Sequence, residues 1–269
     1  MSGRRGVKRP VGVFDSGIGG LSVLRALRAE LPHQSFVYVA DSGHAPYGER
    51  EPGHVIERSQ AITQYLIRQH DIQALVVACN TATAAAIGLL RQQHPELPIV
   101  GVEPALKPAA ASSRTHRVGV MATRGTLQSA KFQALLASLQ GRAEFVLQPC
   151  DGLADAIEHQ DAARIQALCR SYTQAMGRYG SAAGEIDTVV LGCTHYPFAA
   201  DTLHALMGDV VQLVESGAPV ARQTRRVLRE PASSGHPNLR FGTTGQVEQL
   251  RSAVQRWLQP GAAVDKLHI

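Results

Sequence analysis

Two cysteines stand at the points where a buried strand is expected to give way to a helix. Cys79 follows an apolar run and precedes Asn80-Thr81, and Cys193 follows another and precedes Thr194-His195. A helix N-terminus and nearby donors stabilise a thiolate, which then acts as a base or nucleophile near neutral pH. A cysteine at such a place is more often a small buried apolar side chain. The polar residues that follow each cysteine favour a chemical role.

An imidazole accompanies one of the two thiols. His195 lies two residues after Cys193, where it could move a proton at the sulfur or cap the helix. The pair could also bind a metal, but no third and fourth ligands follow at a zinc-type spacing, so a metal site is the weaker prediction. A disulfide framework is not expected, because the four cysteines are widely spaced and the chain shows no secretory leader. No Cys-x-x-Cys pair is present, so neither a zinc ribbon nor a thioredoxin-type pair is expected. Cys150 and Cys169 are expected to be packing residues.

Two further loops carry polar residues after expected strands. The turn Asp15–Gly20 leads into a helix, and such a glycine-rich turn offers backbone N–H groups and the positive end of the helix to an anion. The dinucleotide-binding fingerprint fails, because its third glycine would fall at Ser22. The turn is therefore expected to bind a carboxylate or phosphate of a small ligand. In the loop Asp41–Gly48, Tyr47 is a candidate ligand contact.

The two cysteine motifs together indicate proton transfer at a stereocentre. Inversion of a stereocentre by this route needs a base on one face of the carbon and an acid on the other. Cys79 and Cys193 on opposite walls of one cavity would supply both groups, one as a thiolate and the other as a thiol. The sequence thus favours a two-base inversion mechanism.

The elements that must position these residues alternate between strands and helices. Apolar runs typical of buried parallel strands recur with helical stretches between them, which predicts an α/β fold with mainly parallel sheets. Ligands in such folds bind at the carboxyl ends of the strands, where both cysteines fall. The predicted strands are Val11–Phe14, Phe36–Ala40, Ala74–Ala78, Ile99–Val102, Val118–Met121, Glu144–Gln148, Thr188–Leu191, Val210–Leu213 and Leu239–Phe241.

The chain also repeats itself, which predicts two similar domains. Residues 71–81, in which an acidic residue and an apolar run precede Cys79, match residues 185–195 in pattern, and Val11–Phe14 matches Val118–Met121. We expect the two domains to be related by a pseudo-two-fold axis, with the active site between them. The final strand is expected to return to the first domain. The expected domains are residues 1–103 with 217–269, and residues 104–216.

The composition is that of an ordinary globular chain. Of the 269 residues, 44% are apolar and 18% are charged, which excludes a largely disordered protein. No apolar stretch approaches the roughly 18 residues of a membrane span. A soluble, cytoplasmic protein without membrane contacts is therefore expected.

Taken together, the motifs resemble the glutamate racemase family over nearly the whole chain. The segments that carry the resemblance are Phe14–Leu21, Asp41 with Pro46–Gly48, Ala78–Ala82, Thr123 with Gly125-Thr126, Gly192–Pro197 and Thr243–Gly245. The resemblance implies a two-base racemase that interconverts L- and D-glutamate without a cofactor or a metal and supplies D-glutamate for peptidoglycan. It also implies a homodimer.

The resemblance assigns roles to individual residues. Cys79 would be the base for D-glutamate, supported by Asp15, and Cys193 the base for L-glutamate, supported by His195. Glu158 corresponds to an acidic residue of the family near the histidine. The implied substrate-binding residues are Asp15, Ser16, Pro46, Tyr47, Gly48, Asn80, Thr81, Thr123, Thr126, Thr194 and Glu158.

The sequence departs from the family pattern at three places. Ser42-Gly43 stands where Thr-Ala is commoner, Asp151 replaces a frequent proline, and Glu215-Ser216 replaces Asp-Ser. None of these changes removes a proposed base.

Two alternatives remain open. A related two-cysteine racemase would act on aspartate or a hydantoin, and the motif spacing does not identify the residues that set substrate length. A binding protein would instead use Arg222, Arg225, Arg226 and Arg229, whose spacing forms a basic stripe on one helix face, to contact DNA or a DNA enzyme. Nucleic acid is the weaker prediction, because aromatic residues make up only 5% of the chain and no nucleic-acid-binding motif is recognisable.

Overall fold

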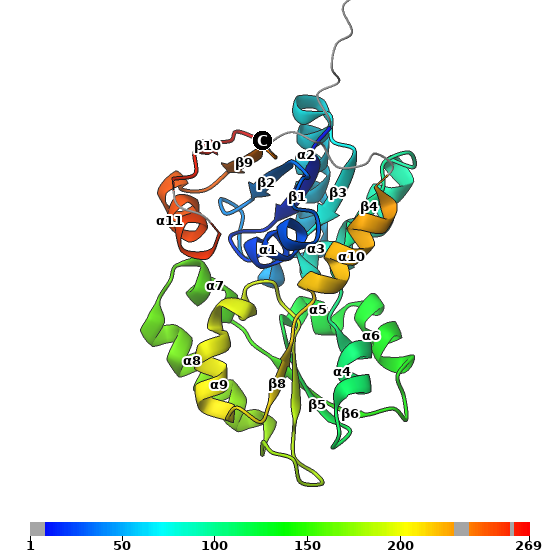
Figure 1. Ribbon diagram of the computed structural model, residues 1–269, viewed down its shortest axis with the longest axis vertical. Helices are drawn as coiled ribbons and strands as arrows, with labels where there is room; N and C mark the ends of the chain where they lie inside the picture. The colour runs from blue at the N-terminus through cyan, green and yellow to red at the C-terminus, as the bar shows by residue number, and fades with distance from the viewer. Residues whose placement is uncertain (1–8, 229–236, 259–260) are drawn as a thin grey trace, which may run out of the picture.

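The computed structural model describes residues 9–228, 237–258 and 261–269. These residues form two α/β units, called the first and the second layer, which lie one beyond the other along the long axis (Figure 1). Each layer is built on its own sheet. The first sheet contains β1 (Val11–Asp15), β2 (Phe36–Ala40), β3 (Ala74–Val77), β4 (Ile99–Gly101), β9 (Leu239–Thr243) and β10 (Val264–Lys266). The second contains β5 (Arg117–Ala122), β6 (Glu144–Pro149), β7 (Thr188–Leu191) and β8 (Gln212–Val214).

Four strands of each sheet follow the same order. The first sheet runs β10-β9-β2-β1-β3-β4 and the second β6-β5-β7-β8, so β1 corresponds to β5 and β3 to β7. All strand pairings in the described ranges are parallel. The predicted fold class, α/β with mainly parallel sheets in two similar sets, is therefore confirmed. β9 pairs with β2, so the chain returns to the first sheet after completing the second.

Two strands differ clearly from the sequence prediction. The strand predicted at Val210–Leu213 begins at Gln212, because Gly208 has a φ of 86° and starts a turn that leaves Val210 exposed. β10 was not predicted, because its three residues, Val264–Lys266, include only one buried apolar side chain. Pattern-based prediction needs a longer apolar alternation than this edge strand provides.

Helices cover both faces of each sheet. In the first layer, α1 (Leu21–Glu30), α10 (Gly217–Val227) and α11 (Val247–Trp257) pack on one face, and α2 (Pro52–His70) and α3 (Asn80–Gln93) pack on the other. In the second layer, α7 (Leu153–Glu158), α8 (Ala162–Met176) and α9 (Ala200–Met207) lie opposite α4 (Leu106–Ser112), α5 (Arg124–Gln128) and α6 (Ala130–Ala137). Two short 3₁₀ helices are η1 (Tyr47–Glu49) and η2 (Tyr196–Ala199).

The predicted basic stripe lies on α10. Arg222, Arg225 and Arg226 are exposed, but Arg225 pairs with Glu30 of α1 at 2.9 Å, and Arg229 lies outside the described residues.

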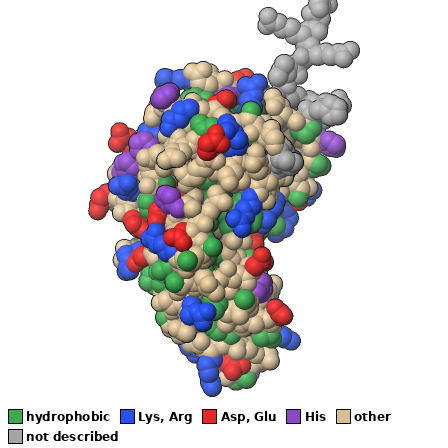
Figure 2. All heavy atoms as spheres, turned by 90° about the vertical axis from the view of Figure 1, so that its left-hand side faces the viewer, with side chains coloured by type: hydrophobic (Ala, Val, Ile, Leu, Met, Phe, Trp, Pro, Cys, Tyr) green, Lys and Arg blue, Asp and Glu red, His purple; other side chains and the backbone are tan. Residues whose placement is uncertain are grey.

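On the face that carries α11, α7 and α8, basic and acidic side chains are interspersed (Figure 2). No helix within the described ranges is long and apolar enough to cross a membrane.

A buried ion pair fixes the loop that follows β2. The carboxylate of Asp41 is fully buried and accepts hydrogen bonds from Arg58 Nε at 2.9 Å and Arg58 Nη2 at 3.0 Å. The hydroxyls of Tyr47 and Thr244 also donate to it, at 2.6 Å and 2.7 Å. Asp41 therefore ties its own loop to α2 and to the end of β9, and this network shapes one side of the region where the strands end.

Replacing Arg58 by methionine should lower the free energy of unfolding by about 3 kcal/mol, because Asp41 would remain as a buried charge without its cation. Urea denaturation followed by circular dichroism measures this change. The control, Arg225→Met, breaks a more exposed pair with Glu30 and should cost less than about 1 kcal/mol. Equal losses in the two variants would contradict the importance of the buried pair.

Candidate active site

Cys79 lies at the N-cap of α3, directly after β3. Its Sγ accepts a hydrogen bond from the Ala82 N–H at 3.4 Å. Burial, and next the negative charge of Asp15, nevertheless raise the pKa of Cys79 well above its usual value. Burial thus opposes the stabilisation of a thiolate expected from the helix N-terminus, and the role of Cys79 as a base stays a prediction.

Cys193 follows β7 and lies beside a charged imidazole. His195 Nδ1 is 3.8 Å from Cys193 Sγ, and His195 Nε2 is 2.7 Å from Glu158 Oε2. Burial alone would lower the pKa of His195, but the contacts with Cys193 and Glu158 raise it well above its usual value. Both ring nitrogens of an imidazolium are donors, so one N–H faces the sulfur and the other faces the carboxylate. The His195 side chain makes no helix-capping hydrogen bond.

The buried carboxylate of Glu158 joins three segments of the chain. Besides the contact with His195, Oε2 accepts a hydrogen bond from the Ile18 N–H at 2.8 Å, and Oε1 accepts one from Ser42 Oγ at 2.7 Å. Burial alone would raise the pKa of Glu158, but the hydrogen bond and charge of His195 outweigh it and lower the pKa below its usual value. Glu158 and His195 therefore form a buried ion pair.

The glycine-rich turn after β1 packs directly against this ion pair. A Cβ on Gly17 would lie 2.2 Å from Glu158 Oε2, and one on Gly19 would lie 2.3 Å from His195 Nδ1. These glycines are required by close approach of other side chains. The Ile18 N–H of this turn binds the protein's own Glu158 carboxylate, whereas Ser16 lines the cavity, so a ligand anion at this turn stays a prediction that rests on Ser16.

Asp15 ends β1 and is fully buried. Its Oδ2 accepts the Gly20 N–H at 2.6 Å and lies 3.4 Å from the Thr194 hydroxyl, which donates to it. Burial is the largest of the influences that raise the pKa of Asp15. The negative charge of Asp15 raises the pKa of Cys79. Asp15 also contacts Thr194, the residue that follows Cys193.

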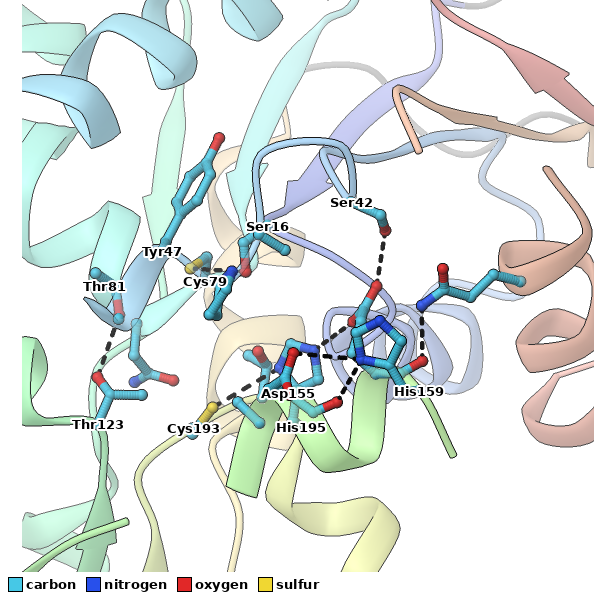
Figure 3. Close-up of a pocket in the computed structure, with 18 residues that line it drawn as sticks. Ser16, Ser42, Tyr47, Cys79, Thr81, Thr123, Asp155, His159, Cys193 and His195 are labelled. Carbon is cyan, nitrogen blue, oxygen red and sulfur yellow. Dashed lines mark hydrogen bonds and ion pairs between the residues drawn. The ribbon is translucent and has the colours of Figure 1, made fainter. Parts of the chain in front are cut away.

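Loops from both sheets line one cavity of about 150 Å³ (Figure 3). Cys79 and Cys193 both border it, from elements of different sheets. The volume lies below the roughly 300 Å³ at which drug-sized sites begin, so the cavity suits a small metabolite. Among the predicted site residues, those that line it are Ser16, Pro46, Tyr47, Gly48, Cys79, Asn80, Thr81, Thr123, Glu158, Cys193, Thr194 and His195.

Two predicted site residues do not line the cavity. Asp15 lies outside its wall, and Thr126 is buried in α5, where its N–H and hydroxyl both contact the Thr123 hydroxyl, at 3.2 Å and 3.0 Å. Thr126 therefore supports Thr123. Tyr47 lines the cavity, but its hydroxyl donates to Asp41. The polar group that was expected to contact a ligand is therefore already engaged within the protein.

Several lining residues were missed by the sequence analysis. Asp155 lies three residues before Glu158 on α7, and this helical spacing could have pointed to it. His159 directly follows Glu158 and carries no such signal. Gln249 comes from α11 and has no local signal, because only the fold brings that helix to the cavity. The missed residues are Ser42, Ala45, Ala154, Asp155, His159 and Gln249.

The remaining cysteines do not join the site. Cys150 and Cys169 are buried in one hydrophobic cluster of the second layer, as predicted for packing residues. Within the described ranges, no group of three or more His, Cys, Asp or Glu side chains is arranged to hold a metal.

Comparison with known proteins decides the family. Residues 21–224 match the family described as Asp/Glu/hydantoin racemase. The chain belongs to this racemase family. The resemblance predicted from the motifs is thereby confirmed.

Individual members of the racemase family are similar over nearly their whole length. The chain is 47% identical over 263 residues to a glutamate racemase of Ectopseudomonas mendocina (strain ymp), covering 95% of this chain and 97% of that one. Its structure is similar to glutamate racemase isoform RacE1 from Bacillus anthracis, with a TM-score of 0.84, 30% identity and coverage of 97% and 98%. Escherichia coli glutamate racemase in complex with L-glutamate and activator UDP-MurNAc-ala is also similar, with a TM-score of 0.82, 31% identity and coverage of 97% of this chain and 98% of that one.

The titration of His195 should reveal the ion pair of this racemase site. The pKa of His195 is raised above the usual 6.5 and that of Glu158 is lowered below the usual 4.5, so the pair stabilises the fold fully between pH 4.5 and 6.5. The stabilisation is lost as pH rises through the folded-state pKa of His195 or falls through that of Glu158. Glu158→Gln should lower the pKa of His195, as measured from the His195 Cε1 signal in ¹H–¹³C NMR spectra. Glu144→Gln, which breaks the more exposed pair with Arg117, should leave it unchanged. An equal His195 pKa in all three proteins would exclude the pair.

Gly19→Ala should lower the free energy of unfolding by about 1–3 kcal/mol, because the added methyl group overlaps the His195 ring. Thermal unfolding followed by circular dichroism measures the loss. The control is Gly53→Ala in α2, where an added Cβ meets no atom within 4 Å and the change should be neutral or slightly stabilising. A Gly19→Ala protein as stable as the control would refute the close packing.

Proposed function

We propose that this protein is a glutamate racemase that interconverts L- and D-glutamate with two cysteine bases and no cofactor. One observation carries the proposal: Cys79 and Cys193 follow the corresponding strands β3 and β7 and line the same cavity. A substrate held there would have one sulfur available to each face of its C2 atom. The names of the similar proteins support glutamate as the substrate.

In the direction from L- to D-glutamate, the Cys193 thiolate removes the proton from C2. The C2–H bond breaks, an S–H bond forms at Cys193, and the electron pair left at C2 takes a proton from the Cys79 thiol on the opposite face. The raised pKa of Cys79 and the imidazolium of His195 beside Cys193 support this starting arrangement. The reverse reaction starts with the thiolate at Cys79 and the thiol at Cys193.

Neutral donors would bind the carboxylates of the substrate. None of the residues that line the described cavity is Lys or Arg, and hydroxyls and an amide supply the donors instead. Asn80 Nδ2 is a buried donor without a partner among the described residues, and a substrate carboxylate would satisfy it. Preorganised donors in a buried site also stabilise the charge that develops at C2. The proposed substrate-binding hydroxyls are those of Ser16, Thr81, Thr123 and Thr194.

The proposal extends to supporting residues. Asp15, whose charge acts on Cys79, would support that base, and His195 would support Cys193. Glu158, Pro46, Tyr47 and Gly48 would shape the site through the contacts described above, and Thr126 would act through Thr123.

The proposed organisation follows the two sheets. Residues 1–103 and 217–269 would form one domain and residues 104–216 the other, because β1–β4, β9 and β10 belong to the first sheet and β5–β8 to the second. As the family resemblance implies, the enzyme would be a cytoplasmic homodimer that supplies D-glutamate for peptidoglycan.

The decisive experiment follows loss of optical activity and α-proton exchange of L- and D-glutamate in D₂O, with chelator and without added cofactor. The wild type should racemise both enantiomers. Cys79→Ser and Cys193→Ser should each lower racemisation at least 10²-fold, the size of an acid–base contribution. Cys169→Ser makes the same change in α8, away from the cavity, and should retain activity.

Substrate comparison separates the alternatives. Activity on aspartate or a hydantoin with none on glutamate would keep the two bases and overturn the substrate. A wild type that is inactive on all of these substrates would favour the hypothesis of a protein that binds DNA or a DNA enzyme. Racemisation that survives in either cysteine variant would refute the two-base mechanism.

A further inference from the structure

Ser42 lines the cavity, and the motifs assigned it no role. It follows Asp41 at the carboxyl end of β2, and its hydroxyl donates to Glu158 Oε1 at 2.7 Å (Figure 3). Asp41 is itself held by Arg58 and Tyr47, so the backbone that presents Ser42 is anchored on its N-terminal side. The Ser42 hydroxyl is therefore presented by an anchored backbone and donates to a charged acceptor.

The two oxygens of Glu158 have different partners. Oε2 accepts from the Ile18 N–H and contacts His195 Nε2, whereas Ser42 is the single donor to Oε1 within the described part of the chain. Without Ser42, one oxygen of a buried carboxylate would lose its hydrogen bond, which is costly for a charged group. The carboxylate would then rotate to share the remaining donors, and its contact with His195 would weaken.

We propose that Ser42 is a positioning residue that acts through Glu158 to keep the His195 ring directed at Cys193. The contacts in this relay are 2.7 Å from Ser42 Oγ to Glu158 Oε1, 2.7 Å from Glu158 Oε2 to His195 Nε2, and 3.8 Å from His195 Nδ1 to Cys193 Sγ. The inference rests on the proposed racemase function for its kinetic consequences, but the relay itself is a structural statement.

The relay serves one of the two proposed bases. Cys79 has its own neighbours, since its sulfur accepts from Ala82 and lies 3.9 Å from the Ser16 hydroxyl. No hydrogen bond between Ser42 and Cys79 is found in the described residues. Loss of the Ser42 hydroxyl should therefore slow proton transfer at Cys193 and leave that at Cys79 largely unchanged.

Rates in the two directions cannot separate the two steps. L- and D-glutamate have equal free energies in water, so kcat/KM must be the same in both directions for every variant. The primary deuterium isotope effect does separate them, because it reports how far removal of the C2 deuteron limits kcat/KM. That removal occurs at Cys193 for C2-deuterated L-glutamate and at Cys79 for C2-deuterated D-glutamate.

The kinetic test compares Ser42→Ala, Ser42→Thr and Ser112→Ala. Ser42→Ala should lower kcat/KM about tenfold, the effect of losing one hydrogen bond to a charged group. The isotope effect should rise for deuterated L-glutamate and fall for deuterated D-glutamate. Ser42→Thr keeps the hydroxyl and should behave as wild type, and Ser112→Ala removes a hydroxyl bonded only to a carbonyl of its own helix. A wild-type kcat/KM in Ser42→Ala, or a loss with unchanged isotope effects, would overturn the proposal.

A second measurement does not depend on the substrate. Exchange of the His195 Nε2 proton with water, followed by ¹H–¹⁵N NMR, should be faster in Ser42→Ala than in wild type and in Ser112→Ala. Unchanged exchange would overturn the relay even if glutamate proved not to be the substrate. If Ser42→Ala does not fold, Ser42→Cys, whose thiol is a weaker donor of similar size, replaces it with the same expected results. A wild type that fails to racemise glutamate would refute the proposed function and leave the exchange result to decide the relay.

Discussion

The buried pair of Glu158 and His195 is the contact on which the rest of the site depends. A charge taken out of water must be matched by an opposite charge and by donors for its remaining lone pairs. Glu158 meets this requirement with His195, the Ile18 N–H and Ser42. Each partner comes from a different strand end, so the pair draws these loops together, and the glycines of the first turn leave the room it needs.

The two thiols occupy equivalent places in the repeated topology but lie in different electrostatic surroundings. Cys79 is buried, and burial and the charge of Asp15 raise its pKa. Cys193 lies beside an imidazolium. The repeat provides two similar positions at the strand ends, and the neighbouring charges then distinguish them. In the proposed two-base reaction one sulfur holds a proton while the other accepts one, and the two sulfurs exchange these states when the direction reverses.

Contacts between the two layers hold the cavity walls beside each other. Gln249 of α11 donates to the Glu158 carbonyl at 2.8 Å, next to the cavity. Farther along α11, the ring of Trp257 stacks on Phe198 of η2, with 4.4 Å between the centroids. Both contacts depend on the return of the chain to the first sheet through β9, which places α11 against the second layer (Figure 1).

The sequence by itself determined the fold class, most of the strands and the positions of the two cysteines, because apolar periodicity, strand-end residues and an internal repeat are local signals. The resemblance of its motifs to the glutamate racemase family also pointed to Glu158. Only the tertiary structure decided that the glycine-rich turn packs on Glu158, that Ser42 and Gln249 reach the cavity, and that burial raises the pKa of Cys79. These features depend on burial and on contacts between residues up to 140 positions apart, which no local pattern encodes.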